Sequence, residues 1–456
     1  MAAESLEAAI RRVGSPVTLL RDAAARPHTF PVAGEFTNWR SEQHAWRSTC
    51  ALLDQSHHMT DLFLSGPDAA RLLSDFGVNS FANFTPGRAK QYVACNADGH
   101  FVGDAILFQL DEGQFDVVGH PTVPNWLQYQ AEAGGYDVTF DRDENSADRP
   151  FGPPRFYRYE LQGPNAPALL EKLTGAPLPD VPFFHTTEFT VAGHRVRALR
   201  HGMAGRPGFE LFGPWAEGED VLAAIREVGA GFGLVRAGAK AYSTANLESG
   251  WIPTAVPAVF GPDEQGYREW LGADALGSLG GSLHTDDITD YYLTPYDLGY
   301  GRNVRFDHDF HGRAALQRHA GADHRHKVTL VWNPDDVADL VRSLAEPGTP
   351  AKYLDLPKAR YAFFHVDRVL AGDSGGAGGT DVGLSLDAGY IANEQAFVSL
   401  ATVDAAAAEP GTEVRLLWGE EPNSAKPAVE PHRQREIRAT VAPAPYVRAV
   451  RETYRR

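Results

Sequence analysis

The chain has 456 residues, which exceeds a single ordinary hydrophobic core, so we expect two or three domains. Hydrophobic residues make up 43% and charged residues 22%, which indicates a folded globular protein and excludes disordered and fibrous classes. The formal net charge of −17 repels phosphate backbones and anionic membrane surfaces, and this argues against nucleic acid or a membrane as partner.

The N-terminal segment, the absence of long apolar runs and the two cysteines indicate the cellular compartment. The opening MAAESLEAAIRRVGSPVTLL contains acidic residues and no long apolar core, so it predicts neither a signal nor a transit peptide. No run of about 18 apolar residues predicts a membrane span. Cys50 and Cys95 lack CxxC or CxxxC spacing and are too few for a disulfide framework. We therefore expect a cytoplasmic protein with two small buried cysteines.

The first predicted elements are helices, through SLEAAIRRVG and through TNWRSEQHAWRSTCALL from Thr37, where Trp39, Trp46 and Leu53 have near-helical spacing. Alternating segments follow in DLFLSG, QYVACNADGHFVGDAILFQL and QFDVVGH, divided by Asn/Asp-Gly turns as in antiparallel hairpins. PDAARLLSDFG and NWLQYQAEAGG predict helices among these strands. Strands and helices without strict alternation indicate an α+β arrangement.

One pattern occurs twice. DLFLSGPDAARLLSDFG and RYELQGPNAPALLEKLTG both predict a strand, a Gly-Pro corner and an amphipathic helix. Two copies of one supersecondary unit favour two related subdomains, although common turn chemistry gives the same pattern by coincidence.

The character changes near His326, where HKVTLVWN, VGLSLDAGYIANEQAFVSLATVD, GTEVRLLWG and REIRATVAPAPY predict short strands with few helices. We therefore predict a β-rich C-terminal domain over 325–456, after two interleaved subdomains over 1–324. The glycine-rich segment AGDSGGAGGTDVG (371–383) lacks the spacing of a phosphate-binding loop and predicts a hairpin tip.

Two adjacent histidines, His57 and His58, lie in DQSHHM. Three roles are open for them: metal ligand, general base or packing residue. In a strand they point to opposite faces, so they do not bind one metal ion together. A hydrogen-bonded structural histidine remains an equal alternative for either one. The sequence has no HExxH, P-loop, nucleophile elbow or paired CxxC, and we predict no metal site.

Several longer motifs carry a family resemblance. DQSHHM, LQGP, RHGMAGRPGFELFGP, AYSTANLESGWIP and FDHDFHGRAAL resemble, in this order, the aminomethyltransferase superfamily built around the glycine cleavage T-protein. EFTNWRSEQHAWR, NLESGWIP and VEPHRQ are most similar to its bacterial tetrahydrofolate-dependent O-demethylases of lignin-derived methoxybenzoates such as vanillate and syringate.

This resemblance implies a three-domain cloverleaf with two related α+β N-terminal subdomains, a C-terminal β-barrel and a central folate channel. It also implies transfer of a methyl group from an aryl ether to N5 of tetrahydrofolate, without metal, flavin or oxygen. The expected partner is a small methoxylated aromatic molecule. The oligomeric state is left open.

The folate-binding residues are assigned by the resemblance. Adjacent N–H donors of a pterin suit a carboxylate, and Glu210 in GFELFGP resembles the pterin-binding glutamate of the superfamily. A solvent-facing glutamate on a strand edge is the alternative. The resemblance gives the further cofactor residues as Trp251, Phe184, Glu160 and Gln162.

The catalytic prediction is Tyr242 with His58. A tyrosine, with an ordinary pKa of about 10, matches a departing phenol and can donate or relay a proton to the ether oxygen. A buried packing tyrosine is the alternative. Gln55, His57 and His58 lie where the O-demethylases line the substrate pocket, and we favour His58 as the one that faces the substrate.

Two further substrate residues depart from the family. The vanillate enzymes have an arginine where this chain has His120 and a tyrosine where it has His28. Because histidine lacks the planar fork of arginine, the benzoate carboxylate is held differently here or is absent from the substrate. Gly103 beside Asp104 replaces an acidic pair of T-proteins, which argues against glycine-cleavage chemistry.

Three classes of function remain. The leading one is a tetrahydrofolate-dependent aromatic O-demethylase. The second is another folate-linked methyl transfer, from nitrogen or sulfur of a small metabolite or in natural-product biosynthesis. The third is a folate-binding scaffold without catalysis, because fold alone does not define function.

Overall fold

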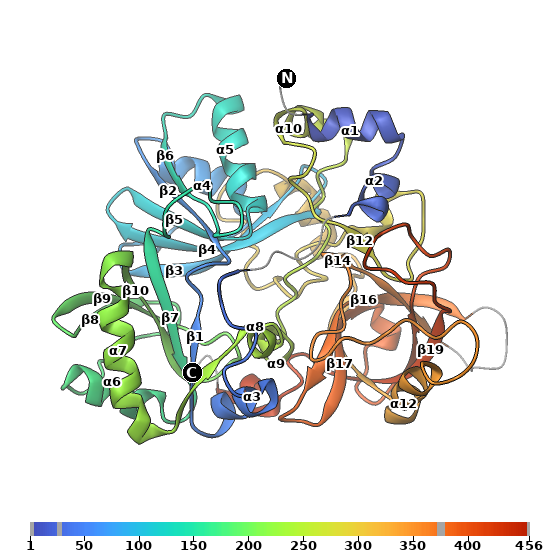
Figure 1. Cartoon of the computed structure of the whole chain (residues 1–456). Helices are drawn as coiled ribbons and strands as arrows, with labels where there is room; N and C mark the ends of the chain where they lie inside the picture. The colour runs from blue at the N-terminus through green and yellow to red at the C-terminus, as the bar shows by residue number, and fades with distance from the viewer. Residues whose placement is uncertain (1–3, 25–29, 372–378, 454–456) are drawn as a thin grey trace.

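The computed structural model describes residues 4–24, 30–371 and 379–453. Two mixed α+β units lie on one side of the molecule and a β-barrel lies on the other (Figure 1). The predicted α+β class and three-part architecture are confirmed.

The first unit is a five-stranded antiparallel sheet in the order β3-β4-β5-β2-β6. Helices α4 and α5 pack on its outer face, where Leu62, Leu64 and Val117 are fully buried or nearly so. The elements are β2 (Thr60–Ser65), α4 (Ala69–Phe76), β3 (Arg88–Cys95), β4 (Phe101–Asp111), β5 (Gln114–Gly119), α5 (Thr122–Gly134) and β6 (Thr139–Asp143).

The second unit is a six-stranded sheet in the order β11-β1-β7-β10-β9-β8. Its outer face carries Tyr157, Tyr159 and Leu161 against helices α6 and α7. The elements are β1 (Cys50–Asp54), β7 (Phe156–Gln162), α6 (Ala166–Thr174), β8 (Thr186–Val191), β9 (His194–Arg200), β10 (Gly208–Pro214), α7 (Gly218–Gly229) and β11 (Leu234–Ala237).

The two sheets have one topology. Strands β3-β4-β5-β2 of the first match β8-β9-β10-β7 of the second, and β6 and β1 take the equivalent next place. The repeated Gly-Pro corner explains the sequence pattern: Gly66 and Gly163 have φ of 126° and 132°. A Cβ at either glycine would lie 2.6 Å from a carbonyl oxygen, that of Asp137 or Thr49, respectively.

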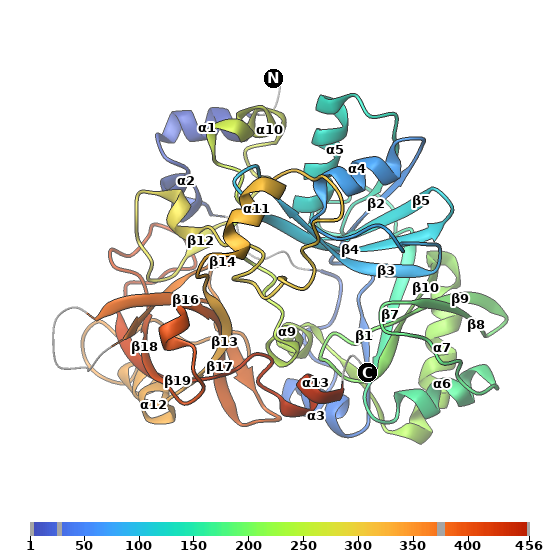
Figure 2. The same ribbon diagram turned by 180° about the vertical axis from the view of Figure 1, so that it is seen from behind.

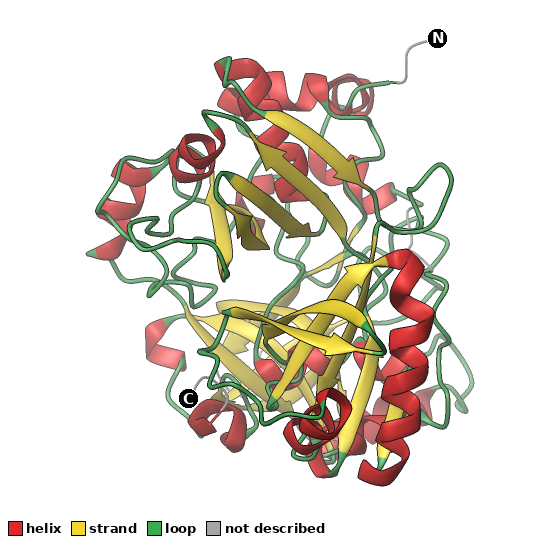
Figure 3. Ribbon diagram, turned by 90° about the vertical axis from the view of Figure 1, so that its left-hand side faces the viewer, coloured by secondary structure: helices red, strands yellow, loops and turns green. Residues whose placement is uncertain are grey.

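The inner faces of the two sheets pack against each other. Phe108 and Val118 from the first sheet meet Leu199 and Phe212 from the second in one buried cluster. Figure 3 shows the sheets one above the other, with helices on their outer sides. The polar inner residues of β7 and β10 therefore lie between the two units.

The C-terminal barrel closes in the order β13-β17-β16-β15-β18-β19, and β19 pairs back with β13. Its first strand begins at His326, and the domain boundary at 324/325 stays a prediction. The tip of the glycine-rich hairpin lies outside the described residues. The elements are β13 (His326–Trp332), α12 (Pro334–Ser343), β15 (Asp367–Ala371), β16 (Thr380–Ile391), β17 (Ala396–Val403), β18 (Glu413–Trp418) and β19 (Arg435–Pro443).

The remaining elements connect these units. The helices are α1 (Leu6–Val13), α2 (Pro16–Asp22), α3 (Trp39–Ser48), α8 (Ala239–Tyr242), α9 (Ala245–Ser249), α10 (Gln265–Trp270), α11 (Arg313–Ala320) and α13 (Arg448–Thr453), and a short two-stranded sheet joins β12 (Leu279–Gly280) to β14 (Phe364–His365). From behind, α13 lies beside α3 and below the six-stranded sheet (Figure 2). Within the described ranges no helix has the length and apolar character needed to cross a membrane.

One helix prediction was too long. The helix predicted from Thr37 ends at Ser48, and Leu53 belongs to strand β1. The CALL segment pairs with both β7 and β11, so its backbone hydrogen bonds go to a sheet instead of a helix.

Candidate active site

The DQSHHM segment connects the two sheets. Strand β1 ends at Asp54 and β2 begins at Thr60, so both histidines lie in the connecting loop and not in a strand. Their side chains nevertheless diverge. The His57 Nδ1 is 2.8 Å from the Ser146 hydroxyl and its ring packs edge-on against Trp215, whereas His58 turns toward Tyr242.

His58 and Tyr242 form a hydrogen-bonded pair, with 2.9 Å between the imidazole Nε2 and the phenol oxygen. The ring of Phe30 also packs edge-on against His58. Burial, with the nearby charge of Arg158, lowers the pKa of His58 to about 4, so the imidazole is neutral at physiological pH. Burial and the carboxylates of Glu160 and Glu210 raise the pKa of Tyr242 well above its ordinary value.

Three polar side chains lie on the inner face of the six-stranded sheet. Glu160 and Gln162 alternate along β7, and Glu160 is directly opposite Glu210 of β10. All three are buried. The Gly202–Arg206 turn, which connects β9 to β10, lies at the end of the sheet that bears Gln162, because Gly208 pairs with Gln162.

Each buried group has specific partners. Glu160 accepts hydrogen bonds from the Gln55 side-chain amide and, at 2.6 Å, from the Met203 backbone N–H. Burial raises the pKa of Glu160 to about 8, although the Met203 bond opposes the rise. Gln162 Oε1 accepts from the Ala204 N–H at 3.0 Å, while its Nε2 has no partner among the described residues.

Glu210 is held from one side. Its Oε1 accepts a 2.9 Å hydrogen bond from Nη1 of Arg158, and no hydrogen bond within the described part of the chain occupies Oε2. Burial raises the pKa of Glu210, and the Arg158 charge opposes this rise. One carboxylate oxygen is therefore fixed and the other is left as an acceptor.

A second polar group centres on Asp104 of β4. Its Oδ2 accepts hydrogen bonds from the Gln91 amide at 2.7 Å, the Trp251 indole at 2.8 Å and the Tyr300 hydroxyl. Burial raises the pKa of Asp104, although these three donors oppose it. Trp251, predicted as a cofactor residue, is thus held by the first sheet. A Cβ at Gly103 would lie 2.8 Å from Val123, so this position has little room for a second acidic side chain.

Two other predicted residues, Phe184 and His120, lie at the margins of the site. Phe184 has the left-handed φ of 59° and packs near the cluster between the sheets. His120 is exposed at the end of β5, 2.7 Å from the Thr122 hydroxyl, with its ring 4.8 Å from that of Phe363. Because Gly119 pairs with Thr60, His120 lies at the same end of the sheet as the histidine loop. His28 falls outside the described residues.

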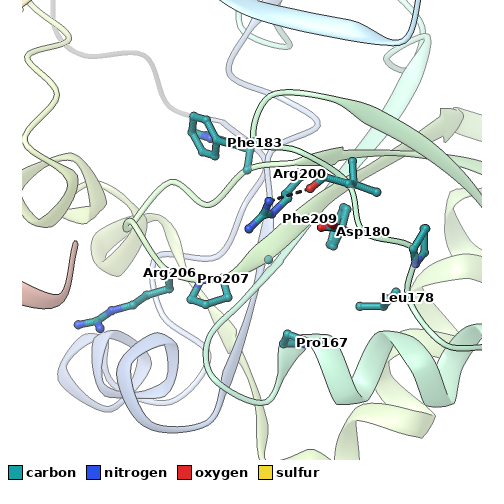
Figure 4. Close-up of a pocket in the computed structure, with 12 residues that line it drawn as sticks. Pro167, Leu178, Asp180, Phe183, Arg200, Arg206, Pro207 and Phe209 are labelled. Carbon is teal, nitrogen blue, oxygen red and sulfur yellow. Dashed lines mark hydrogen bonds between the residues drawn. The ribbon is translucent and has the colours of Figure 1, made fainter. Parts of the chain in front are cut away.

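A cavity of about 250 Å³ lies behind the strand that carries Glu210. Pro167, Leu178, Phe183 and Phe209 form apolar parts of its wall, and Arg200 donates to the Val181 carbonyl there. Figure 4 shows Arg206 extending away from the other labelled side chains. None of the predicted site residues is part of the described lining, so this cavity is separate from the His58–Tyr242 pair.

Two residues of the site were not predicted from the sequence. Arg158 contacts Glu210, and Phe30 contacts His58. Arg158 had a visible signal, because it alternates with Glu160 and Gln162 in YRYELQ. Phe30 had none, since no periodic pattern surrounds it.

Comparison with known proteins identifies the family. Residues 21–255 match the family described as the GCVT N-terminal domain. This segment is more than half of the chain, and the chain belongs to that aminomethyltransferase superfamily, as its motifs predicted.

Individual relatives are enzymes of one-carbon transfer by name. The chain is 44% identical to the syringate O-demethylase of Sphingobium sp., over 99% of this chain and 98% of that protein. It is 33% identical to the sesamin methylene transferase of Sinomonas sp., over 84% and 82% of the two chains. Among solved structures, the aminomethyltransferase T of the Bartonella henselae glycine cleavage system superposes with a TM-score of 0.61 at 18% identity, covering 93% of this chain and 95% of the other, and supports the fold.

Proposed function

We propose that this protein is a tetrahydrofolate-dependent O-demethylase, which transfers the methyl group of a methoxylated aromatic compound to N5 of tetrahydrofolate and releases a phenol. The observation that carries the proposal is the His58–Tyr242 hydrogen bond beside the buried carboxylates of β7 and β10. The full-length similarity to a syringate O-demethylase supports the class of substrate, a lignin-derived methoxybenzoate or a related ether.

The residues between the sheets fit a pterin. Its ring edge offers N–H donors together with a carbonyl acceptor. Glu210 Oε2 can accept from the donors, and the Gln162 Nε2, which lacks a described partner, can donate to the acceptor. Trp251 and Phe184 supply apolar walls, and Glu160 supports the site through Gln55 and Met203. When bound, tetrahydrofolate supplies the amine that receives the methyl group.

Tyr242 carries the proton chemistry. The departing phenolate is costly in a dry site unless it receives a proton or a strong hydrogen bond. The Tyr242 hydroxyl is hydrogen-bonded to Nε2 of the neutral His58, and in the complex with substrate it would turn from this nitrogen to donate to the ether oxygen. The proton that Tyr242 gives to the leaving group would be replaced by the proton that the accepting amine loses when it is methylated, so His58 stays neutral. Positioning of the two reactants contributes up to about 7 to 11 kcal/mol in favourable cases.

The substrate side combines Gln55, His58 and His120, with His28 as a further predicted contact. His57 supports the loop through Ser146 rather than through Tyr242. Because His120 replaces the arginine fork of the vanillate enzymes, we propose that a substrate carboxylate is gripped less firmly here. The free, buried Cys50 and Cys95 agree with a reducing compartment, and we place the reaction in the cytoplasm.

A panel of methyl donors tests the assignment. Vanillate, syringate, 3-O-methylgallate and guaiacol are incubated with and without tetrahydrofolate, and phenol and 5-methyltetrahydrofolate are measured by mass spectrometry. We expect folate-dependent formation of both products in equal amounts from at least one donor. Absence of 5-methyltetrahydrofolate with every donor, from folded protein, would exclude the proposed reaction.

Tyr242→Phe tests the catalytic assignment. Removing the proton donor should lower turnover by about 10² to 10⁴-fold while folate binding persists. Tyr159→Phe is the matched control, because Tyr159 lies on the helix-covered face of β7. Full activity of Tyr242→Phe would remove this hydroxyl from the chemistry.

A second candidate is transfer of a different one-carbon group. The 33% identity to a sesamin methylene transferase favours it specifically. Sesamin belongs in the same donor panel, with 5,10-methylenetetrahydrofolate as the product to be measured. Formation of that product with no demethylation of the methoxy compounds would favour this second function.

A further inference from the structure

Arg158 lies at the centre of a buried acidic group that is drawn from both sheets. Its Nη1 donates to Glu210, and its Nη2 donates to Asp61 and, at 3.2 Å, to Asp116. The Arg158 side chain is 3% exposed. The rings of Phe108 and Phe212 lie 5.7 and 5.1 Å from the guanidinium carbon and exclude water.

The charges in this group do not balance if every acid is ionised. Asp61, Asp116 and Glu210 accept hydrogen bonds from the Arg158 guanidinium, Glu160 lies opposite Glu210 in the sheet, and all four acids are buried. Burial and the neighbouring Asp61 raise the pKa of Asp116 well above its ordinary value, and both favour its neutral form. The charge of Arg158 is then shared between Asp61 on one sheet and Glu210 on the other.

We propose that Arg158 is a positioning residue for the cofactor: it keeps the Glu210 carboxylate ionised and turns Oε2 toward the folate, and Asp61 competes with Glu210 for the same guanidinium. This inference rests on the proposed role of Glu210 as the pterin acceptor. A neutral Glu210 would present one oxygen as an acceptor and one as a hydroxyl donor, which matches the two N–H donors of a pterin poorly.

The proposal predicts opposite effects from two substitutions. Arg158→Met removes the charge that opposes the upward shift of the Glu210 pKa, so folate binding should need a higher pH. Asp61→Asn removes a carboxylate that raises the pKa of Glu210, so binding should persist to a lower pH. Generalised damage to the fold would not improve binding at acidic pH.

The experiment measures affinity for 5-formyltetrahydrofolate by tryptophan fluorescence between pH 5 and 8. This probe keeps the pterin edge, does not accept a methyl group and lacks a basic N5. Asp116 and His58 are the other titratable groups near Arg158, and Glu160 and Tyr242 are those near Glu210. The measurement follows only the acidic side of the pH profile, where loss of binding follows protonation of Glu210.

We expect Arg158→Met to weaken binding by at least about tenfold at neutral pH, with recovery as the pH rises, and Arg158→Lys to restore part of the loss. An acidic limb that does not move in folded Arg158→Met would overturn the inference. If that variant does not fold, Asp61→Asn is the deciding test. The inference is overturned if the pH at which Asp61→Asn loses probe binding is unchanged or higher than in the wild type.

Glu210→Gln separates this inference from the proposed function. Loss of probe binding in Glu210→Gln, with no effect of the Arg158 and Asp61 substitutions, would reject the positioning role alone. Unchanged binding in Glu210→Gln would instead reject Glu210 as the pterin acceptor.

Discussion

The two N-terminal sheets share a topology but differ in chemistry at equivalent positions. Counted back from the corner glycines, Asp61 of β2 matches Arg158 of β7. Asp116 pairs with Phe63, three residues before Gly66, and Glu210 pairs with Glu160, three residues before Gly163. These two acids therefore also correspond. One copy therefore supplies acids alone, and the other supplies an acid with the cation that holds all three.

This difference separates structure from function in a repeated unit. The corners, helices and outer apolar faces are kept in both sheets because each must cover its own hydrophobic side. The inner faces meet each other and are free to diverge. Residues that differ between the copies on the inner faces are thus candidates for function, whereas those that agree maintain the fold.

Substitution of the corner glycines should have the largest effect and tests the shared part. Gly66→Ala and Gly163→Ala each place a Cβ 2.6 Å from a backbone oxygen at a positive φ. We expect each to cost about 2 to 5 kcal/mol in the free energy of unfolding, measured by urea denaturation. Gly175→Ala is the control, since its φ of 71° carries backbone strain without a nearby atom. Unequal losses at the two corners would break the equivalence.

A comparison of Glu210→Gln with Asp116→Asn tests the inner faces, which differ between the two sheets. Losing the ionised acceptor at 210 should weaken folate binding by about ten- to a hundredfold, because a hydrogen bond to a charged group contributes about 1.5 to 3 kcal/mol. Burial and Asp61 raise the pKa of Asp116 and favour its neutral form, so an isosteric amide there should weaken binding by a much smaller factor. Titration calorimetry with 5-formyltetrahydrofolate measures both. Equal losses would mean that the two copies contribute alike.

Most of the architecture was predictable from the sequence because it depends on local patterns. Alternation in DLFLSG and RYELQG, and the Gly-Pro corners, gave both central strands and their helices. The error at Leu53 arose where helical spacing competed with pairing to β7 and β11, two strands distant in sequence. Local periodicity does not contain that pairing.

The site was predictable only in part. Glu210, Tyr242 and His58 stand in long motifs, and the structure places His58 against Tyr242. The alternation of Arg158 with Glu160 and Gln162 was visible in the sequence, but its role was not predictable, because its partners lie 42, 52 and 97 residues away in sequence. An arginine that alternates with tyrosines in a strand is predicted to face solvent until the opposing sheet is known.

The last expected effect is a pH dependence of stability at Glu160, the inner-face residue of β7 that takes the place of Phe63 in β2. Its pKa is about 8 in the folded protein, above the ordinary value of 4.5, because it is buried. Between these values the folded state holds a proton that the unfolded state has released. The stability that this group contributes is therefore complete below pH 4.5 and is lost as the pH rises through 8.

Glu160→Gln removes this dependence, because glutamine can still accept from the Met203 N–H but does not titrate. The wild type should lose at most about 1.4 kcal/mol per pH unit relative to the variant as the pH rises toward 8. Urea denaturation of both proteins at several pH values measures the difference. A parallel pH dependence would show that Glu160 is already ionised at neutral pH, and the amide of Gln55 would then be hydrogen-bonded to a charged group.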